Sequence, residues 1–252
     1  MYNVFFALSL TLIAGLATGA GGLIVLFSNI NNKKFLSICL SFSAGVMLYV
    51  AFAEILTESI GVLEDLHSER GYFIATLAFF AGIGIMAVID RFMPHSEDEL
   101  KRTGIMSAVA IAIHNFPEGI ITFMAAVYDP VMGIAIAIAI IIHNIPEALA
   151  MASPIYYSTR SKKKAFLISL GAGLVQPLGA LVAWFFMQNI FTDMGIVFGV
   201  AFAAVAGIMV FVAVHQLLPA AHKFGKHHSV MKWLFAGMAV MAASLVILEY
   251  VL

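Results

Sequence analysis

The feature that most constrains this chain is a series of eight apolar segments, each long enough to cross a lipid bilayer. They cover about residues 3–28, 35–57, 71–91, 105–127, 131–153, 165–187, 195–217 and 231–252. About 20 apolar residues span the hydrocarbon core as an α-helix, and a helix satisfies its own backbone hydrogen bonds there. We therefore expect an all-α, polytopic membrane helix bundle that forms one transmembrane domain over residues 1–252.

Composition supports this class and excludes others. The chain is 62% hydrophobic and 11% charged, whereas a soluble domain has about 25% charged residues. The net charge of -1 gives no indication of nucleic-acid binding. A single cysteine, Cys39, excludes an internal disulfide framework. No large hydrophilic segment is present, so we do not expect an enzyme. The first apolar segment lacks a basic flank and is read as a spanning helix, not a signal peptide.

The basic residues predict the orientation. Twelve of the thirteen lie in the connectors that follow the first, third, fifth and seventh segments: Lys33, Lys34, Arg91, Lys101, Arg102, Arg160, Lys162, Lys163, Lys164, Lys223, Lys226 and Lys232. Lys and Arg are enriched on the cytoplasmic side of membrane proteins, so both termini are expected outside. The second connector is acidic, with Glu58, Glu64, Asp65 and Glu69. Two readings stay open here: a solvated loop, or an outer mouth that attracts cations.

Two apolar segments resemble each other. Residues 44–52 align with residues 206–214, with five of nine positions identical, and residues 15–21 align more weakly with 173–179. The first pair of segments would run in opposite directions across the membrane. This pattern is typical of inverted repeats, which in transporters flank a binding site near the bilayer midplane. The segments 105–127 and 131–153 would then be the central pair.

The central pair carries two copies of one polar motif. They read His114-Asn115-Phe116-Pro117-Glu118-Gly119 and His143-Asn144-Ile145-Pro146-Glu147-Ala148. Because His and Glu stand four residues apart, they share one helix face. A connection of about three residues makes the two helices antiparallel neighbours, so the motifs would face each other. Ionisable residues at this depth are costly and usually functional.

Imidazole and carboxylate ligands suit Zn²⁺, Fe²⁺, Mn²⁺ and Co²⁺. Six mixed ligands without cysteine favour a site that releases its ion over a closed structural site. Two alternatives stay open at this point: the polar groups are hydrogen-bond glue between helices, or the His and Glu side chains relay protons. An intramembrane metalloprotease would need His-Glu-x-x-His, which neither motif contains.

With these motifs, the chain resembles the ZIP (Zrt-, Irt-like protein) metal transporters, in the bacterial zinc-uptake branch. Supporting matches are Ser43-Ala44-Gly45-Val46-Met47 with Phe52-x-Glu54, and Leu217-Leu218-Pro219. The resemblance implies eight helices in a 3+2+3 arrangement, a bacterial plasma (inner) membrane and a binuclear site. Its ligands would be His114, Asn115, Glu118, His143, Asn144 and Glu147. It also implies a homodimer, and a helical bundle that moves against a scaffold.

The chain departs from the family pattern at three polar positions. Gln176 stands before Pro177 where the family often has Glu, and His215 and Gln216 replace an acidic pair. Together with Glu54, these residues are candidates for further metal ligands or for the ion path. His95, His222, His227 and His228 are candidate metal ligands in the cytoplasmic connectors.

The sequence thus predicts a transport domain that moves divalent metal into the cytoplasm. Zinc is the first candidate, and iron, manganese, cobalt and cadmium are further ones. The expected partners are the metal ion, the lipid bilayer and a second copy of the chain, without nucleic acid or a catalytic cofactor. The alternative is a proton-linked carrier of another solute that uses the His–Glu pairs as a proton relay.

Overall fold

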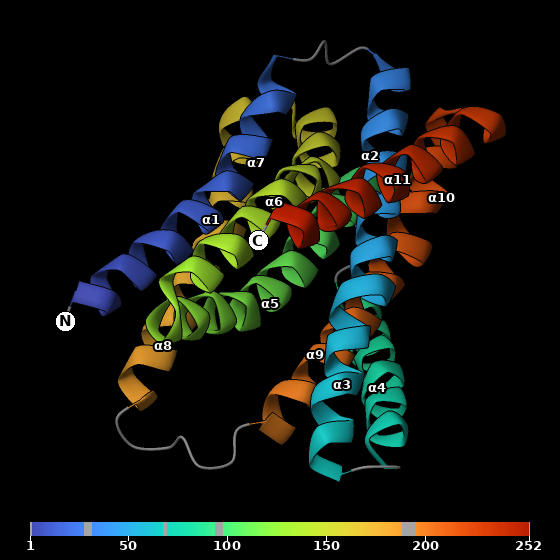
Figure 1. Cartoon of the computed structure of the whole chain (residues 1–252). Coiled ribbons are helices and arrows are strands. Elements are labelled where there is room, and N and C mark those ends of the chain that lie inside the picture. The colour runs from blue at the N-terminus through green and yellow to red at the C-terminus, as the bar shows by residue number, and fades with distance from the viewer. Residues whose placement is uncertain (1, 28–31, 68–69, 94–97, 188–194, 252) are drawn as a thin grey trace.

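The computed structural model of the chain describes residues 2–27, 32–67, 70–93, 98–187 and 195–251. Every regular element in these ranges is a helix (Figure 1). Eight helices within them are long and apolar enough to cross a membrane, which confirms the predicted class. The spans are α1 (Tyr2–Leu26), the run α2 (Lys33–Tyr49), η1 (Val50–Ile55) and α3 (Leu56–His67), α4 (Gly71–Phe92), α5 (Glu99–Tyr128), α6 (Pro130–Thr159), α7 (Lys162–Gly173) with α8 (Val175–Met187), α9 (Gly195–Phe211) with η3 (Val212–Leu217) and α10 (Leu218–Phe224), and α11 (His227–Val251).

Several helices extend further than the apolar segments do. The second span continues to His67, so Glu58, Glu64 and Asp65 lie on helix α3 and not in a loop as the sequence reading had them. Helix α5 begins at Glu99 and α6 ends at Thr159, about six residues beyond the predicted limits. Charged and polar side chains are compatible with helix once they reach water, so hydropathy marks the membrane core and not the helix end.

Polar residues begin several of these helices. The side chains of Asn32, Asp98, Asp129 and Ser161 each accept a hydrogen bond from a backbone N–H in the first turn that follows. Such N-caps satisfy donors that have no partner inside the helix. Asp129 alone separates α5 from α6, and Pro130 occupies the first turn of α6, where its fixed backbone angle is favourable. This short joint holds the two motif helices side by side.

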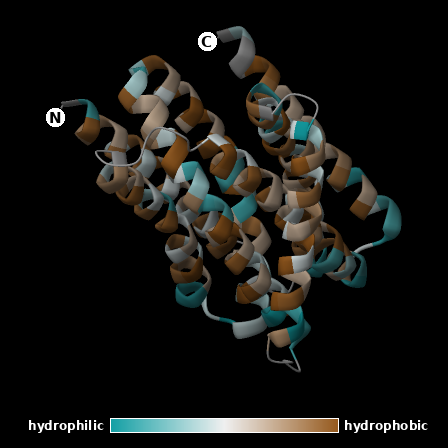
Figure 2. Cartoon of the chain, turned by 90° about the horizontal axis from the view of Figure 1, so that it is seen from below, coloured by the Kyte–Doolittle hydropathy of each residue, from teal (hydrophilic) through white to brown (hydrophobic). Residues whose placement is uncertain are grey.

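The helices form two groups that meet along α2, α5, α6 and α9. One group contains α1, α5, α6, α7 and α8, and the other contains α2, α3, α4, α9, α10 and α11 (Figure 1). Large apolar side chains such as Phe5, Phe73, Phe80 and Phe185 are exposed on the outside, and hydrophilic residues gather at helix ends and in the interior (Figure 2). This distribution is what a lipid-facing surface requires.

The two aligned stretches, residues 44–52 and 206–214, have matching structures, as the predicted repeat requires. The π-helical segments η1 and η3 occupy aligned positions, and they lie on spans that run in opposite directions (Figure 1). Gly45 on α2 packs against the backbone of Leu234 in α11, and the aligned Gly207 on α9 packs against the backbone of Phe79 in α4. The repeat therefore extends from the sequence to helix packing.

Candidate metal site between helices α5 and α6

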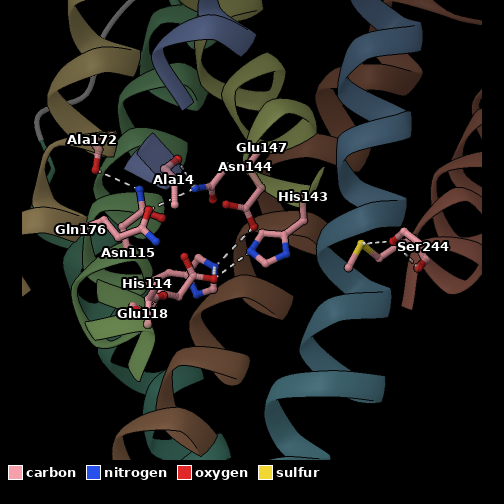
Figure 3. Close-up of polar contacts among 12 residues, drawn as sticks. Ala14, His114, Asn115, Glu118, His143, Asn144, Glu147, Ala172, Gln176 and Ser244 are labelled. Carbon is pink, nitrogen blue, oxygen red and sulfur yellow. Dashed lines mark hydrogen bonds and ion pairs between the residues drawn. The ribbon is translucent and has the colours of Figure 1, made fainter. Parts of the chain in front are cut away.

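The two motifs meet in the interior, where one carboxylate lies between two imidazoles (Figure 3). Glu118 Oε1 is 2.8 Å from His143 Nε2 and 3.0 Å from His114 Nε2. His114 Nε2 is also 3.6 Å from Glu147 Oε1. Tetrahedral zinc with ligand bonds of about 2.0–2.1 Å separates its ligand atoms by about 3.3–3.4 Å. The three distances bracket that spacing, so a small adjustment would admit an ion.

The ligand atoms are buried, and many have no partner. All six motif residues are at most 7% exposed. Among the described residues, no hydrogen-bond partner is found for Asn115 Oδ1, Glu118 Oε2, Asn144 Oδ1 or either carboxylate oxygen of Glu147. Buried polar atoms are nearly always hydrogen-bonded in proteins. A set of five such oxygens around two imidazoles fits a cation as the missing partner.

Both asparagines are held so that their oxygens are free. Asn115 Nδ2 donates to Ala172 O at 2.9 Å, and Asn144 Nδ2 donates to Ala14 O at 3.0 Å. Ala14 and Ala172 each directly precede one of the two aligned stretches, residues 15–21 and 173–179. Each amide therefore donates to the backbone of a neighbouring helix, Asn115 to α7 and Asn144 to α1, and its oxygen remains available as a ligand.

Gln176 adjoins this group, but it faces an asparagine. Its side chain is fully buried. Asn144 Nδ2, which also donates to Ala14 O, donates to Gln176 Oε1 at 3.2 Å. Gln176 Nε2 has no partner among the described residues. In the structure Gln176 thus contacts Asn144, and its role as a further metal ligand stays a prediction.

The other candidates, Glu54, His215 and Gln216, have different neighbours. Glu54 on η1 interacts electrostatically with His143 and Glu118, and its Oε2 is buried without a partner in the described structure. Gln216 on η3 instead donates to Asp90 Oδ1 at 2.8 Å and contacts His215 at 3.2 Å. Glu54 is therefore within electrostatic range of the motif site, whereas Gln216 and His215 contact other groups.

Sequence reasoning missed the partners of Gln216. Asp90 accepts from Arg102, with 3.0 Å between Asp90 Oδ1 and an Arg102 guanidinium nitrogen. A cavity of about 260 Å³ next to this cluster is lined by Arg102, His215, Gln216 and Lys223, among others. The signal was present, because Asp90 is an ionisable residue inside a predicted apolar span.

The candidate histidines near the basic connectors have mixed outcomes. His95 lies outside the described residues. His222 and His227 approach each other across the joint between α10 and α11, with 3.2 Å between their ring nitrogens. The ring of His228 stands 6.0 Å from that of His227, centre to centre. All three are exposed and separate from the motif site.

Comparisons with known proteins point to one group. Residues 3–102 and 94–245 match the family model described as ZIP Zinc transporter. The chain is 46% identical over 265 residues to a protein named Zinc transporter ZupT from Chlorobium chlorochromatii (strain CaD3), which covers 97% of this chain and 98% of that one. It is 48% identical to a protein of the same name from Lysinibacillus sphaericus (strain C3-41), with 98% of each chain covered. A third, from Clostridium perfringens (strain 13 / Type A), is 44% identical over 98% of this chain and 97% of its own length.

Proposed function

Because the chain belongs to the ZIP zinc transporter family, we propose that it imports Zn²⁺ through the site between α5 and α6. Fe²⁺, Mn²⁺, Co²⁺ and Cd²⁺ are further candidate substrates, since imidazole and carboxylate ligands suit them as well. The proposed ligands are the six motif residues: His114, Asn115, Glu118, His143, Asn144 and Glu147. The relatives named above are zinc transporters, which supports zinc as the first substrate to test.

One observation carries this proposal: the Glu118 carboxylate lies between His114 and His143, and the buried Glu147 carboxylate, 3.6 Å from His114 Nε2, has no hydrogen-bond partner in the described structure. Two carboxylates balance the charge of one divalent ion, which lowers the cost of removing its water in a low-dielectric interior. In the proposed cycle, imidazole nitrogens and the oxygens of Asn and Glu replace the water of the ion one by one. His114 and His143 both contact Glu118, so the proposed ligands also have partners among themselves.

The proposed path runs from the acidic end of the second span to the basic end of the molecule. Glu54 is within electrostatic range of the motif site, and Glu58 and Glu64 follow on α3 toward the predicted outer face. The cavity of about 260 Å³ beside His215 and Gln216 is the proposed exit. A membrane potential of 100 mV supplies about 4.6 kcal/mol for two charges, so potential alone can drive uptake.

The setting of the protein is part of the same proposal. We place it in the plasma membrane of a bacterium with both termini outside, following its basic connectors. It acts there as a single transport domain, as a homodimer and without enzymatic activity. The two helix groups would move relative to each other during transport, since the motif helices lie in one group and Glu54 and Gln216 in the other.

Uptake of ⁶⁵Zn into proteoliposomes tests the ligand set. Glu147→Gln keeps the shape of the buried side chain but removes its charge, so we expect zinc uptake at least about tenfold lower. Asp129→Asn is the matched control, because Asp129 is an exposed carboxylate outside the proposed path, and asparagine keeps the side-chain oxygen that caps α6. Competition by Fe²⁺, Mn²⁺, Co²⁺ and Cd²⁺ in the wild type gives the selectivity. Equal uptake by both variants and the wild type would exclude these ligands.

A second candidate is supported by the hydrogen bond between His143 Nε2 and Glu118 Oε1 at 2.8 Å. Such a pair is also suited to passing a proton, as in a proton-linked carrier of another solute. The same vesicles distinguish the two functions. Zinc uptake that saturates and depends on Glu147 supports the importer, whereas proton flux that ignores every metal, together with no zinc uptake at any imposed potential, supports the carrier.

A further inference from the structure

Two exposed imidazoles approach each other at the joint between α10 and α11. His222 lies in α10 and His227 is the first residue of α11. His222 Nε2 is 3.2 Å from His227 Nδ1, and the two ring centres are 5.3 Å apart. The function proposed above does not use this surface histidine pair.

A backbone carbonyl group in the same helix determines which ring nitrogen of His222 carries the hydrogen. Its Nδ1 lies 2.9 Å from the carbonyl oxygen of Leu218, one turn earlier in the same helix. A carbonyl oxygen only accepts, so Nδ1 carries the hydrogen and Nε2 presents a lone pair toward His227. Metal-binding histidines have this arrangement as a rule: one ring nitrogen donates to a carbonyl or carboxylate while the other binds the metal.

The distance between the two nitrogens also fits a metal. Zinc bound to imidazole at about 2.0–2.1 Å in tetrahedral geometry separates two such nitrogens by about 3.3–3.4 Å. The observed 3.2 Å is close to this value, so an ion would sit between the rings with little movement. Water would complete the coordination, because the pair is exposed.

The joint that carries the pair is held by several contacts. Only Gly225 and Lys226 separate α10 from α11. Gly225 N donates to Ala221 O, and Ser37 Oγ on α2 donates to the same carbonyl oxygen. A side chain at Gly225 would meet Ser37 Oγ at 2.1 Å, so the joint is pressed against α2. The two rings are thus presented by a fixed turn, which reduces the entropy lost when they bind one ion.

Part of the positive charge beside the histidine pair is balanced, although Lys226 directly precedes His227. The closest cation in sequence to His222 is Lys223, whose ammonium group pairs with the Glu99 carboxylate on α5. This pair offsets the lysine charge beside the site. Both residues also line the cavity of about 260 Å³ that contains His215 and Gln216, so the histidine pair stands on the same end of the molecule as that cavity.

We propose that His222 and His227 chelate one divalent ion of the Zn²⁺ class at the surface, as a site independent of the α5–α6 ligands. The ion binds both imidazoles and water, and it exchanges readily because two protein ligands hold it. Its use as a station for ions leaving the cavity rests on the proposed import function, whereas its existence as a binding site does not.

Metal binding to the purified full chain in detergent tests this site. Zn²⁺ alone is the probe, and equilibrium dialysis gives the number and affinity of bound ions for the wild type, His222→Ala, His227→Ala and His228→Ala. We expect the two pair variants to lose one class of sites, with affinity at least about tenfold lower than in the wild type. His228→Ala is the matched control and should bind as the wild type does, since it removes a neighbouring exposed imidazole.

A second measurement separates chelation from simple contact between rings. Zn²⁺ that binds the folded chain at this site raises its thermal midpoint, and part of that rise should disappear in His222→Ala and His227→Ala. Identical stoichiometry, affinity and thermal shift in all four proteins would overturn the proposal, as would an equal loss in His228→Ala. Since no uptake is measured, a failure of the import function leaves these results unaffected.

Discussion

Gln176 lies where helix α8 meets the motif site, and we expect its hydrogen bond with Asn144 to orient that asparagine. Its Oε1 accepts from Asn144 Nδ2, whose other partner is the carbonyl oxygen of Ala14. Gln176→Ala removes one of these two ties, so the Asn144 oxygen is less firmly directed at the ion. A net hydrogen bond contributes about 1 kcal/mol, which predicts a KM for zinc uptake about fivefold higher with little change in kcat.

The conservative variant provides the control for that prediction. Gln176→Glu keeps an oxygen that accepts from Asn144 Nδ2, so its KM should stay well below that of Gln176→Ala. A residue that merely filled space would give the same KM for both variants. A KM unchanged in Gln176→Ala would show that Ala14 alone is sufficient to orient Asn144.

Two of the three glycines in helix α4, Gly82 and Gly84, have different surroundings. A Cβ on Gly82 would lie 1.9 Å from the carbonyl oxygen of Ala204 in α9, whereas a Cβ on Gly84 would have nothing within 4 Å. Gly82→Ala must push the two helices apart, and overpacking of this kind costs about 1–3 kcal/mol. Gly84→Ala should be neutral or stabilising by up to about 1 kcal/mol, because alanine favours helix.

Thermal unfolding of the purified variants in one detergent measures this difference. The midpoint of Gly82→Ala should lie below that of the wild type, and the midpoint of Gly84→Ala should not. If both glycines tolerate alanine equally, α4 and α9 do not pack as closely as the structure shows. The prediction concerns an element pair, since neither glycine approaches the motif site.

The orientation of the whole molecule is predicted from its charge distribution. Labelling of introduced cysteines can measure it, because the chain has one natural cysteine. Cys39 is 3% exposed, so it should react slowly with an impermeant maleimide. Tyr128 is exposed at the end of α5, and Lys163 is exposed near the start of α7. We expect Tyr128→Cys to be labelled in intact cells, and Lys163→Cys only after the membrane is opened. The reverse pattern would invert the proposed topology and the direction of transport.

Much of the membrane architecture was predictable because it follows from chain-local properties. The eight spans come from hydropathy, and the alignment of residues 44–52 with 206–214 predicted a repeat. The structure adds π-helical segments and equivalent packing of Gly45 and Gly207 at aligned positions. The four-residue spacing in each motif put His114 and Glu118 on one face, and the short joint at Asp129 brought α6 beside it. Apart from the repeat, which compares two distant stretches, each of these inferences depends on residues close together in sequence.

Partner choice between distant helices was not predictable in the same way. Gln216 and Glu54 occupy aligned positions, yet Gln216 bonds to Asp90 while Glu54 interacts with His143 and Glu118. Glu64 and Asp65 were expected in a loop and lie on α3 instead. The partner of Gln216 stands far away in the chain, so local sequence does not identify it. Helix α3 continues beyond the apolar segment, and hydropathy does not mark where such a helix ends.

The sequence by itself determined the membrane class, the number of spans and the residue types of the candidate site. A bilayer demands long apolar helices and makes buried ionisable groups costly, so both leave a clear mark in the order of residues. Only the tertiary structure decided that Glu118 lies between both imidazoles, that Asn115 and Asn144 are tied to α7 and α1, and that His222 meets His227. Hydrogen bonds are directional and act over about 3 Å, so which groups pair depends on how the helices pack and not on their spacing along the chain.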